Sequence, residues 1–142
     1  MLFRSKASFL DSYGQHEFIL GETVENDGVK VFVKGGNTDC HYQIRNQKIY
    51  QEVRVMGRMS LEMNYDDFLA TDCGYIPFAY HVVFRNSQTG DVNSILKFTD
   101  TYQKFGDYYI LTKQIVAEYE DGKTETPQSI TEFVYSHIQL LE

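Results

Sequence analysis

The chain has 142 residues, 42% of them hydrophobic, which suits one globular domain with a real core and excludes a disordered chain. Its net charge of −7 repels phosphate backbones and anionic headgroups, so we expect neither nucleic-acid binding nor electrostatic docking on membranes. No run approaches the ~20 apolar residues of a transmembrane helix, and the N-terminus lacks the apolar core of a secretory signal, so we expect a cytoplasmic protein.

The first fifteen residues differ from the rest. Phe3, Ala7 and Leu10 recur at helical spacing, so residues 1–15 form a lead-in that is either a short helix or disordered. Residues 16–141 contain no linker or repeat, and we expect them to form a single β domain. Cys40 and Cys73 are expected to be reduced thiols.

The remaining chain alternates between strands and turns. Tyrosine (11 residues) and phenylalanine (10 residues) are abundant, and both favour strands. Period-two alternation, bounded by turn residues such as Asn46-Gln47 and Gly106-Asp107, predicts strands at 16–24, 29–34, 40–45, 48–64, 79–86, 92–103, 108–120 and 129–140. Residues 65–72 are either a loop or one helical turn. Pro127 cannot donate to a ladder and indicates an edge or a bulge at the last strand.

The connections between these strands are short. Parallel strands need crossovers of a dozen or more residues, so the pattern predicts an antiparallel meander. We therefore expect a mainly β protein with one large bent sheet, similar to a half-barrel. A sheet with one apolar face needs a cover. The sequence offers only the lead-in helix and the segment 65–78 for this purpose.

The stretch VRVMGRMSLEM (53–63) has the longest alternating pattern. As one strand from 48 to 64, it puts Val55, Met59 and Leu61 on an apolar face that we expect to be concave. Gly57 is then the site of a bend. The charged residues of the opposite face are expected to be solvated: Glu52, Arg54, Arg58 and Glu62.

Several segments resemble a known family. RVMGRMSLEMN, GYIPFAYHVVFRN and KFGDYYILTKQIV, together with HEFILGET and VKVFVKG, are similar to an uncharacterised family of cyanobacterial and plastid proteins, catalogued as a domain of unknown function. The resemblance covers about residues 16–141 and implies no activity. The closing hairpins also resemble those of periplasmic lipoprotein carriers, in which an unclosed barrel holds acyl chains on its concave face.

No catalytic or cofactor-binding motif is present in the sequence, so we expect a protein that is not an enzyme and has no cofactor. The four histidines fall on different strands, which does not favour a metal site. The carboxylates at positions 66, 67, 72, 100 and 107 lie in turn-like polar segments and are expected to be solvated.

These observations favour a binding protein that holds an apolar small molecule, lipid or acyl chain on the concave face of the sheet. The candidate ligand-binding residues are Val55, Met59, Leu61, Met63, Phe98 and Tyr108. Phe78, Tyr80 and Tyr135 would contribute if they lie on the same side. The alternative is a protein-protein interaction module, with a protein partner or a second copy of the chain covering the apolar face and no small ligand.

Overall fold

The computed structural model describes residues 17–24, 28–34, 40–120 and 123–139, and within these ranges the chain forms nine strands and no helix. The strands are β1 (Phe18–Val24), β2 (Gly28–Val33), β3 (His41–Arg45), β4 (Lys48–Met56), β5 (Met59–Thr71), β6 (Gly74–Asn86), β7 (Val92–Phe105), β8 (Tyr108–Glu120) and β9 (Ser129–Val134).

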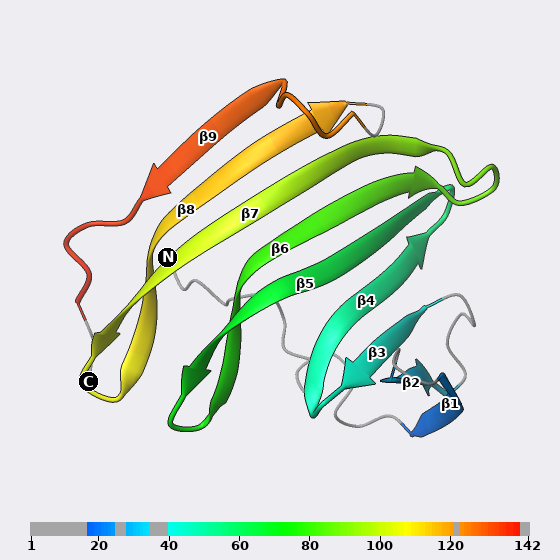
Figure 1. The fold of residues 1–142 in the computed structure, drawn as a ribbon, viewed down its shortest axis with the longest axis horizontal. Helices are drawn as coiled ribbons and strands as arrows, with labels where there is room; N and C mark the ends of the chain where they lie inside the picture. Colours follow the sequence, from blue (N-terminus) through cyan, green and yellow to red (C-terminus); the bar gives the residue numbers. More distant parts are fainter. Residues whose placement is uncertain (1–16, 25–27, 35–39, 121–122, 140–142) are drawn as a thin grey trace.

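All nine strands belong to one antiparallel sheet whose spatial order is their order in the sequence, as Figure 1 shows. Each strand therefore pairs with the strand before and after it, and β1 and β9 are the two edges among the described residues. The sheet is not closed into a barrel. This meander confirms the mainly β fold class expected from the short connections.

Tight turns fix several of these hairpins. Asn46 (φ 51°) and Gln47 (φ 61°) both have positive φ, as the two central residues of a type I′ turn require. Gly57 (φ 62°) and Gly106 (φ 59°) each take the first central position of a two-residue turn, where a type II′ turn needs glycine. These turn types match the right-handed twist of the strands that they join.

The prediction of one strand over 48–64 was wrong. Gly57 and Arg58 form a turn, and β4 folds back on β5 with Met56 opposite Met59. Because a two-residue turn joins positions i and i+3, it brings residues of opposite parity to the same face. Leu61 therefore pairs with Arg54, whereas Val55 pairs with Ser60 on the other face. The apolar residues of the alternating pattern, which suggested a single apolar face, therefore lie on two different faces of the sheet.

The prediction of a loop or helical turn at 65–72 was also wrong. Residues 65–71 continue β5, which pairs with β6 as far as Thr71 opposite Gly74, and Asp72 lies in the turn that follows. The register shifts between Tyr65 and Phe68, and this bulge breaks the period-two pattern. Consequently the segment 65–78 belongs to the sheet and provides no cover for it.

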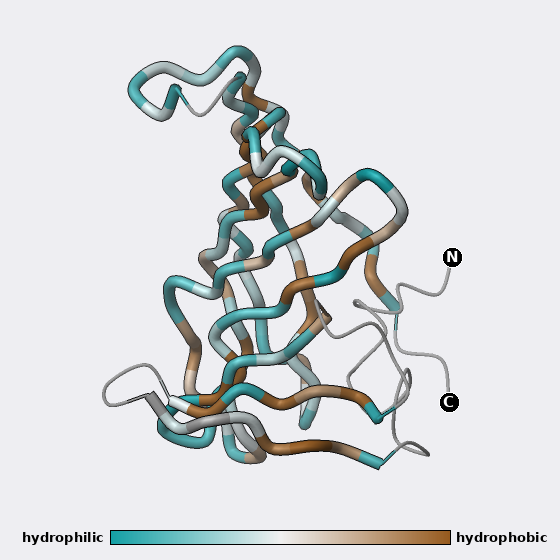
Figure 2. Tube along the Cα trace, turned by 90° about the vertical axis from the view of Figure 1, so that its right-hand side faces the viewer, coloured by the Kyte–Doolittle hydropathy of each residue, from teal (hydrophilic) through white to brown (hydrophobic). Residues whose placement is uncertain are grey.

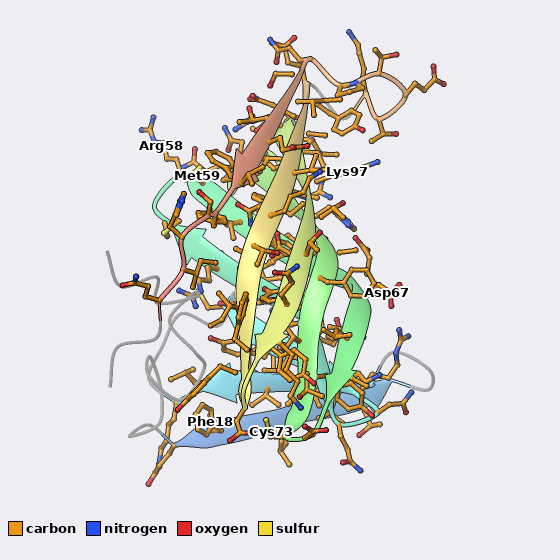
Figure 3. All side chains as sticks on the ribbon, turned by 90° about the vertical axis from the view of Figure 1, so that its left-hand side faces the viewer. Phe18, Arg58, Met59, Asp67, Cys73 and Lys97 are labelled. Carbon is orange, nitrogen blue, oxygen red and sulfur yellow. The ribbon has the colours of Figure 1, made fainter. Side chains whose placement is uncertain are left out.

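The sheet is strongly twisted. In Figure 3, β1 lies across the bottom of the view while β7 and β8 run up and down it. Apolar and polar residues alternate along the strands in Figure 2. We call one face the groove face; a row of cross-strand partners on it is Tyr42, Glu52, Met63, Val82 and Leu96. The other is the outer face, with the row Val53, Glu62, Val83 and Ile95.

The buried apolar side chains gather on the groove face. Tyr42, Tyr80 and Val82 are 3–5% exposed there, and Val31, which pairs with Tyr42, is 6% exposed. Val83 is buried on the outer face. No described element forms a second layer over either face, and the lead-in proposed as a cover lies outside the described residues.

The other strand predictions differ from the structure mainly at their ends. The prediction 108–120 coincides with β8, and β7 continues two residues beyond the predicted 103. The last strand ends at Val134, opposite Lys113, and not at 140. It lies at the edge of the sheet and begins after Pro127, which agrees with the position expected for that proline.

Candidate binding groove

A large open cavity lies on the groove face. Its volume is about 1110 Å³, and its lining comes from β3 to β8 and from Tyr135 beyond β9. Since six neighbouring strands contribute to one cavity, the sheet must curve around it. The apolar residues of the lining include Ile49, Met56, Leu61, Met63, Phe68, Tyr75, Ile76, Pro77 and Leu111.

Aromatic rings form a continuous row across the centre of the groove. The ring of Tyr80 on β6 lies 4.8 Å from that of Phe98 on β7, and the two rings are stacked. Tyr65 on β5 approaches the other side of Tyr80, with ring centroids 6.0 Å apart, and Phe68 lies 6.4 Å from Tyr65. The bulge in β5 is what allows Tyr65 and Phe68, three residues apart, to line the same cavity.

A buried carboxylate lies next to this aromatic row. Asp100 on β7 is only 7% exposed. One carboxylate oxygen accepts hydrogen bonds from the hydroxyls of Tyr80 (3.2 Å) and Tyr102 (3.4 Å), and the other accepts one from the amide of Gln114 on β8 (2.8 Å). The expectation that Asp100 is a solvated turn residue was wrong, because it lies within a central strand whose neighbours hydrogen-bond to it.

A second polar pair lines the same cavity. Glu52 on β4 is 9% exposed and forms an ion pair with Arg54, two residues along the strand. The expectation that Glu52 is solvated was wrong, because the β4–β5 turn places Glu52 on the groove face beside Met63; the Arg54 side chain, opposite Leu61, stays 37% exposed. Lys48, at the start of β4, lies over the ring of Tyr75 at 4.0 Å.

The tyrosines of the groove keep their protons well above neutral pH. Burial, followed by the charge and hydrogen bond of Asp100, raises the pKa of Tyr102 to about 12. Burial raises the pKa of Tyr80 still further, with the same carboxylate contributing. Burial also raises the pKa of Tyr65, with a contribution from the charge of Glu52. At neutral pH these hydroxyls are therefore hydrogen-bonding groups and not bases.

The predicted site residues fall into three groups. Leu61 and Met63 line the cavity, and Met59 shares their face opposite Met56, which lines it too. Phe98 stacks on the lining residue Tyr80. Val55 is on the outer face, where its backbone N–H lies 3.2 Å from the sulfur of Cys40, and Tyr108 is 62% exposed at the start of β8. Tyr80 and Tyr135 line the cavity, and Phe78 does not.

Sequence reasoning missed the polar centre of the groove: Asp100, Tyr102 and Gln114. The alternation of Phe98, Asp100 and Tyr102 along one strand was a usable signal, since an aspartate at period two between aromatic residues faces the side that they face. Gln114 carried no such signal. Its role follows from its pairing opposite Asp100 across β7 and β8.

The outer face carries a smaller depression of about 420 Å³, lined by Asp66, His81, Val83, Ile95, Lys97 and Thr124. His81 and Asp66 are 2.8 Å apart there, and both are partly exposed. In Figure 3, Lys97 points away from the sheet on this side. Within the described ranges, no three histidine, cysteine, aspartate or glutamate residues gather in a way that could hold a metal ion.

The family of the chain is decided by a match over residues 1–141 to the family described as "Protein of unknown function (DUF3386)". The chain belongs to this family. The resemblance of its strands to an uncharacterised domain of unknown function is thereby confirmed, and the match to DUF3386 also includes the first fifteen residues. No curated protein and no solved structure matches the chain. In the part of this DUF3386 protein that the structure describes, no helix is long and apolar enough to span a membrane.

Proposed function

We propose that the protein binds an apolar small molecule or acyl chain in the groove and does not transform it chemically. The observation that carries this proposal is the cavity of about 1110 Å³, whose lining is mainly aromatic and aliphatic. Cavities of this size and composition accommodate drug-sized or lipid-like ligands. A ligand that buried about 300 Å² of apolar surface would gain ~7 kcal/mol before the costs of association.

The polar residues of the groove support binding more than catalysis. The raised pKa values of Tyr80 and Tyr102 keep both hydroxyls protonated, and both hydroxyls are directed to Asp100. Groups held in this way orient a ligand and do not supply a base at neutral pH. Cys40 and Cys73 are both free cysteines, which favours a reducing compartment such as the cytoplasm as the place where the protein acts.

Titration with the neutral dye Nile red tests this proposal. The dye should gain fluorescence with the wild-type protein, and Leu61→Trp, which fills the groove, should weaken its binding by about tenfold or more. Ile95→Trp adds similar bulk on the outer face and should leave dye binding unchanged. Equal binding to all three folded proteins would place the dye outside the groove and contradict the proposal. Native mass spectrometry of the freshly purified protein would show whether a ligand is retained.

A second candidate function, assembly with another copy or another protein, is favoured by the edge strand β9. All six of its residues are exposed, including Ile130 (65%) and Val134 (66%). An exposed apolar edge can add a strand from a partner. Light scattering after size-exclusion chromatography, at protein concentrations from about 10 to 100 μM, distinguishes assembly from ligand binding by a monomer. A stable dimer without retained ligand would favour assembly, whereas a monomer that binds dye would favour the carrier function.

A further inference from the structure

In the polar centre of the groove, every side-chain donor hydrogen of Tyr80, Tyr102 and Gln114 already has an acceptor within the cluster. Tyr80 and Tyr102 each have one hydroxyl hydrogen, and both are donated to the same oxygen of Asp100. The amide nitrogen of Gln114 has two hydrogens. One points to the other oxygen of Asp100 at 2.8 Å and the second to the Tyr80 oxygen at 3.3 Å. The orientation of this amide follows from chemistry, since an ionised carboxylate can only accept.

What remains for a ligand is therefore acceptor capacity. A carboxylate has about four acceptor positions, and three of those on Asp100 are occupied by the two tyrosines and Gln114. The position left lies on the oxygen that Gln114 contacts. The amide oxygen of Gln114 accepts no hydrogen bond from another described residue. A ligand group that binds here has to donate hydrogen bonds.

The negative charge of the Asp100 carboxylate also favours a ligand group that donates hydrogen bonds. Among the described residues, no lysine or arginine forms an ion pair with Asp100, whose partners are all neutral. The positive charge of Arg54 is paired with Glu52, and Lys48 lies over the rings of Phe68 and Tyr75. A carboxylate that is 7% exposed and has no counter-ion leaves an unneutralised negative charge at this point of the cavity. A cation at this point would be stabilised by it.

We infer that the ligand class of the groove is an apolar amine, whose ammonium group binds Asp100 and whose hydrocarbon body lies along Met63, Leu61 and Tyr65. The inference rests on the proposed binding function and makes it specific. The stacked rings of Tyr80 and Phe98 lie next to Asp100, and aromatic faces attract cations. A fatty acid directed the same way would bring its carboxylate toward that of Asp100 and find no donor there, so this position in the groove discriminates against it.

Three ligands with the same chain test the head group: decylamine, decanoate and decanol, each displacing Nile red at pH 7. On the wild-type protein, decylamine should bind about tenfold or more tightly than decanoate, as expected when a charge-assisted hydrogen bond is replaced by repulsion. Asp100→Asn should weaken decylamine by about tenfold to a hundredfold and leave decanol within about twofold. Glu132→Gln removes one carboxylate from the outer face and should change none of the three affinities.

The outcomes separate the inference from the function on which it rests. If decanoate binds the wild-type protein as tightly as decylamine, or if folded Asp100→Asn retains full affinity for decylamine, the amine assignment is overturned while binding in the groove stands. If Asp100→Asn and Glu132→Gln lose affinity for decylamine equally, the loss reflects the net charge of the protein and not contact with Asp100. That result would also overturn the amine assignment. If none of the three ligands displaces the dye, the proposed function itself fails. The wild-type comparison needs no variant, so it decides even if Asp100→Asn does not fold.

Discussion

Tyr80 on β6 donates its hydroxyl hydrogen to the carboxylate of Asp100 on β7 over 3.2 Å. The partner directly opposite Tyr80 is Phe98, so Asp100 occupies the diagonal position two residues further along. One tyrosine thus stacks on its direct neighbour and hydrogen-bonds to its diagonal one. The aromatic row and the polar centre of the groove are joined through this residue.

Removal of the Tyr80 hydroxyl should destabilise the protein without removing the stacked ring. In Tyr80→Phe the ring can still stack on Phe98, but Asp100 loses a donor, and we expect the free energy of unfolding to fall by about 1.5–3 kcal/mol. Urea denaturation measures this change. Tyr108→Phe, at a site that is 62% exposed, should change stability by less than about 0.5 kcal/mol. Equal effects of the two substitutions would show that the hydroxyl of Tyr80 does not support Asp100.

Tyrosine ionisation should be delayed in the folded protein. The pKa of Tyr102 is raised to about 12, first by burial and then by Asp100, and burial raises the pKa values of Tyr65 and Tyr80 as well. In the unfolded chain these groups ionise near pH 10. Their contribution to stability is therefore fully present below pH 10 and is lost as the pH rises through about 12.

Absorbance at 295 nm, followed during an alkaline titration, measures this delay. Tyr65, Tyr80 and Tyr102 should ionise at a higher pH in the folded protein than tyrosines do in an unfolded chain. Tyr102→Phe should remove one residue from this group and reduce the alkaline loss of stability. A single transition near pH 10 in the folded protein would contradict the burial of these hydroxyls.

Substitutions of Gly57 in the β4–β5 turn should change stability through backbone conformation alone. Gly57 has φ of 62°, and a Cβ added there would meet nothing within 4 Å. Gly57→Ala should therefore cost only the backbone strain of a non-glycine residue at this positive φ, about 1–3 kcal/mol. Gly57→Asn should cost less, because asparagine tolerates this conformation better. Thermal unfolding of both variants checks the order, and an alanine variant as stable as the wild type would argue against the turn.

Gly28 should respond much more severely than Gly57. Its φ is 77°, and a Cβ added there would lie 2.1 Å from the carbonyl oxygen of Ile44 on β3. That oxygen belongs to the backbone, so β2 and β3 would have to separate. We expect Gly28→Ala to cost more than about 3 kcal/mol, the sum of strain and lost pairing. The comparison with Gly57→Ala in the same denaturant series provides the control, and equal costs would contradict this packing.

The tips of two hairpins are joined by an ion pair between Asp72 and Lys104 at 2.7 Å. The hydrogen bond and charge of Lys104 lower the pKa of Asp72. A carboxyl whose folded pKa is lowered contributes stability above its ordinary pKa, and this contribution is lost as the pH falls through the folded value. The carboxyl resonance of Asp72, followed by NMR, should titrate below the usual range. In Lys104→Met, or in 1 M salt, its pKa should return toward the ordinary value.

Strand content and the direction of pairing follow from local patterns in the amino-acid sequence. Period-two alternation located β8 at 108–120, and short connections excluded parallel strands because a parallel pair needs a long crossover. Asn46-Gln47 marked a turn because asparagine tolerates positive φ. These features depend on neighbours within a few residues, which is why they can be inferred without a structure.

Which residues face the groove depends on the folded sheet. A two-residue turn at Gly57-Arg58 exchanges the faces of odd and even positions, so Val55 was assigned to the wrong face relative to Leu61 although the alternation was correctly observed. The polar centre is harder to predict from the sequence, because the hydrogen-bond partners of buried Asp100 are distant in the chain. Gln114 is 14 residues away and Tyr80 is 20 residues away. A carboxylate can be placed in an apolar groove only when cross-strand register brings its donors to it, and that register is a property of the folded sheet.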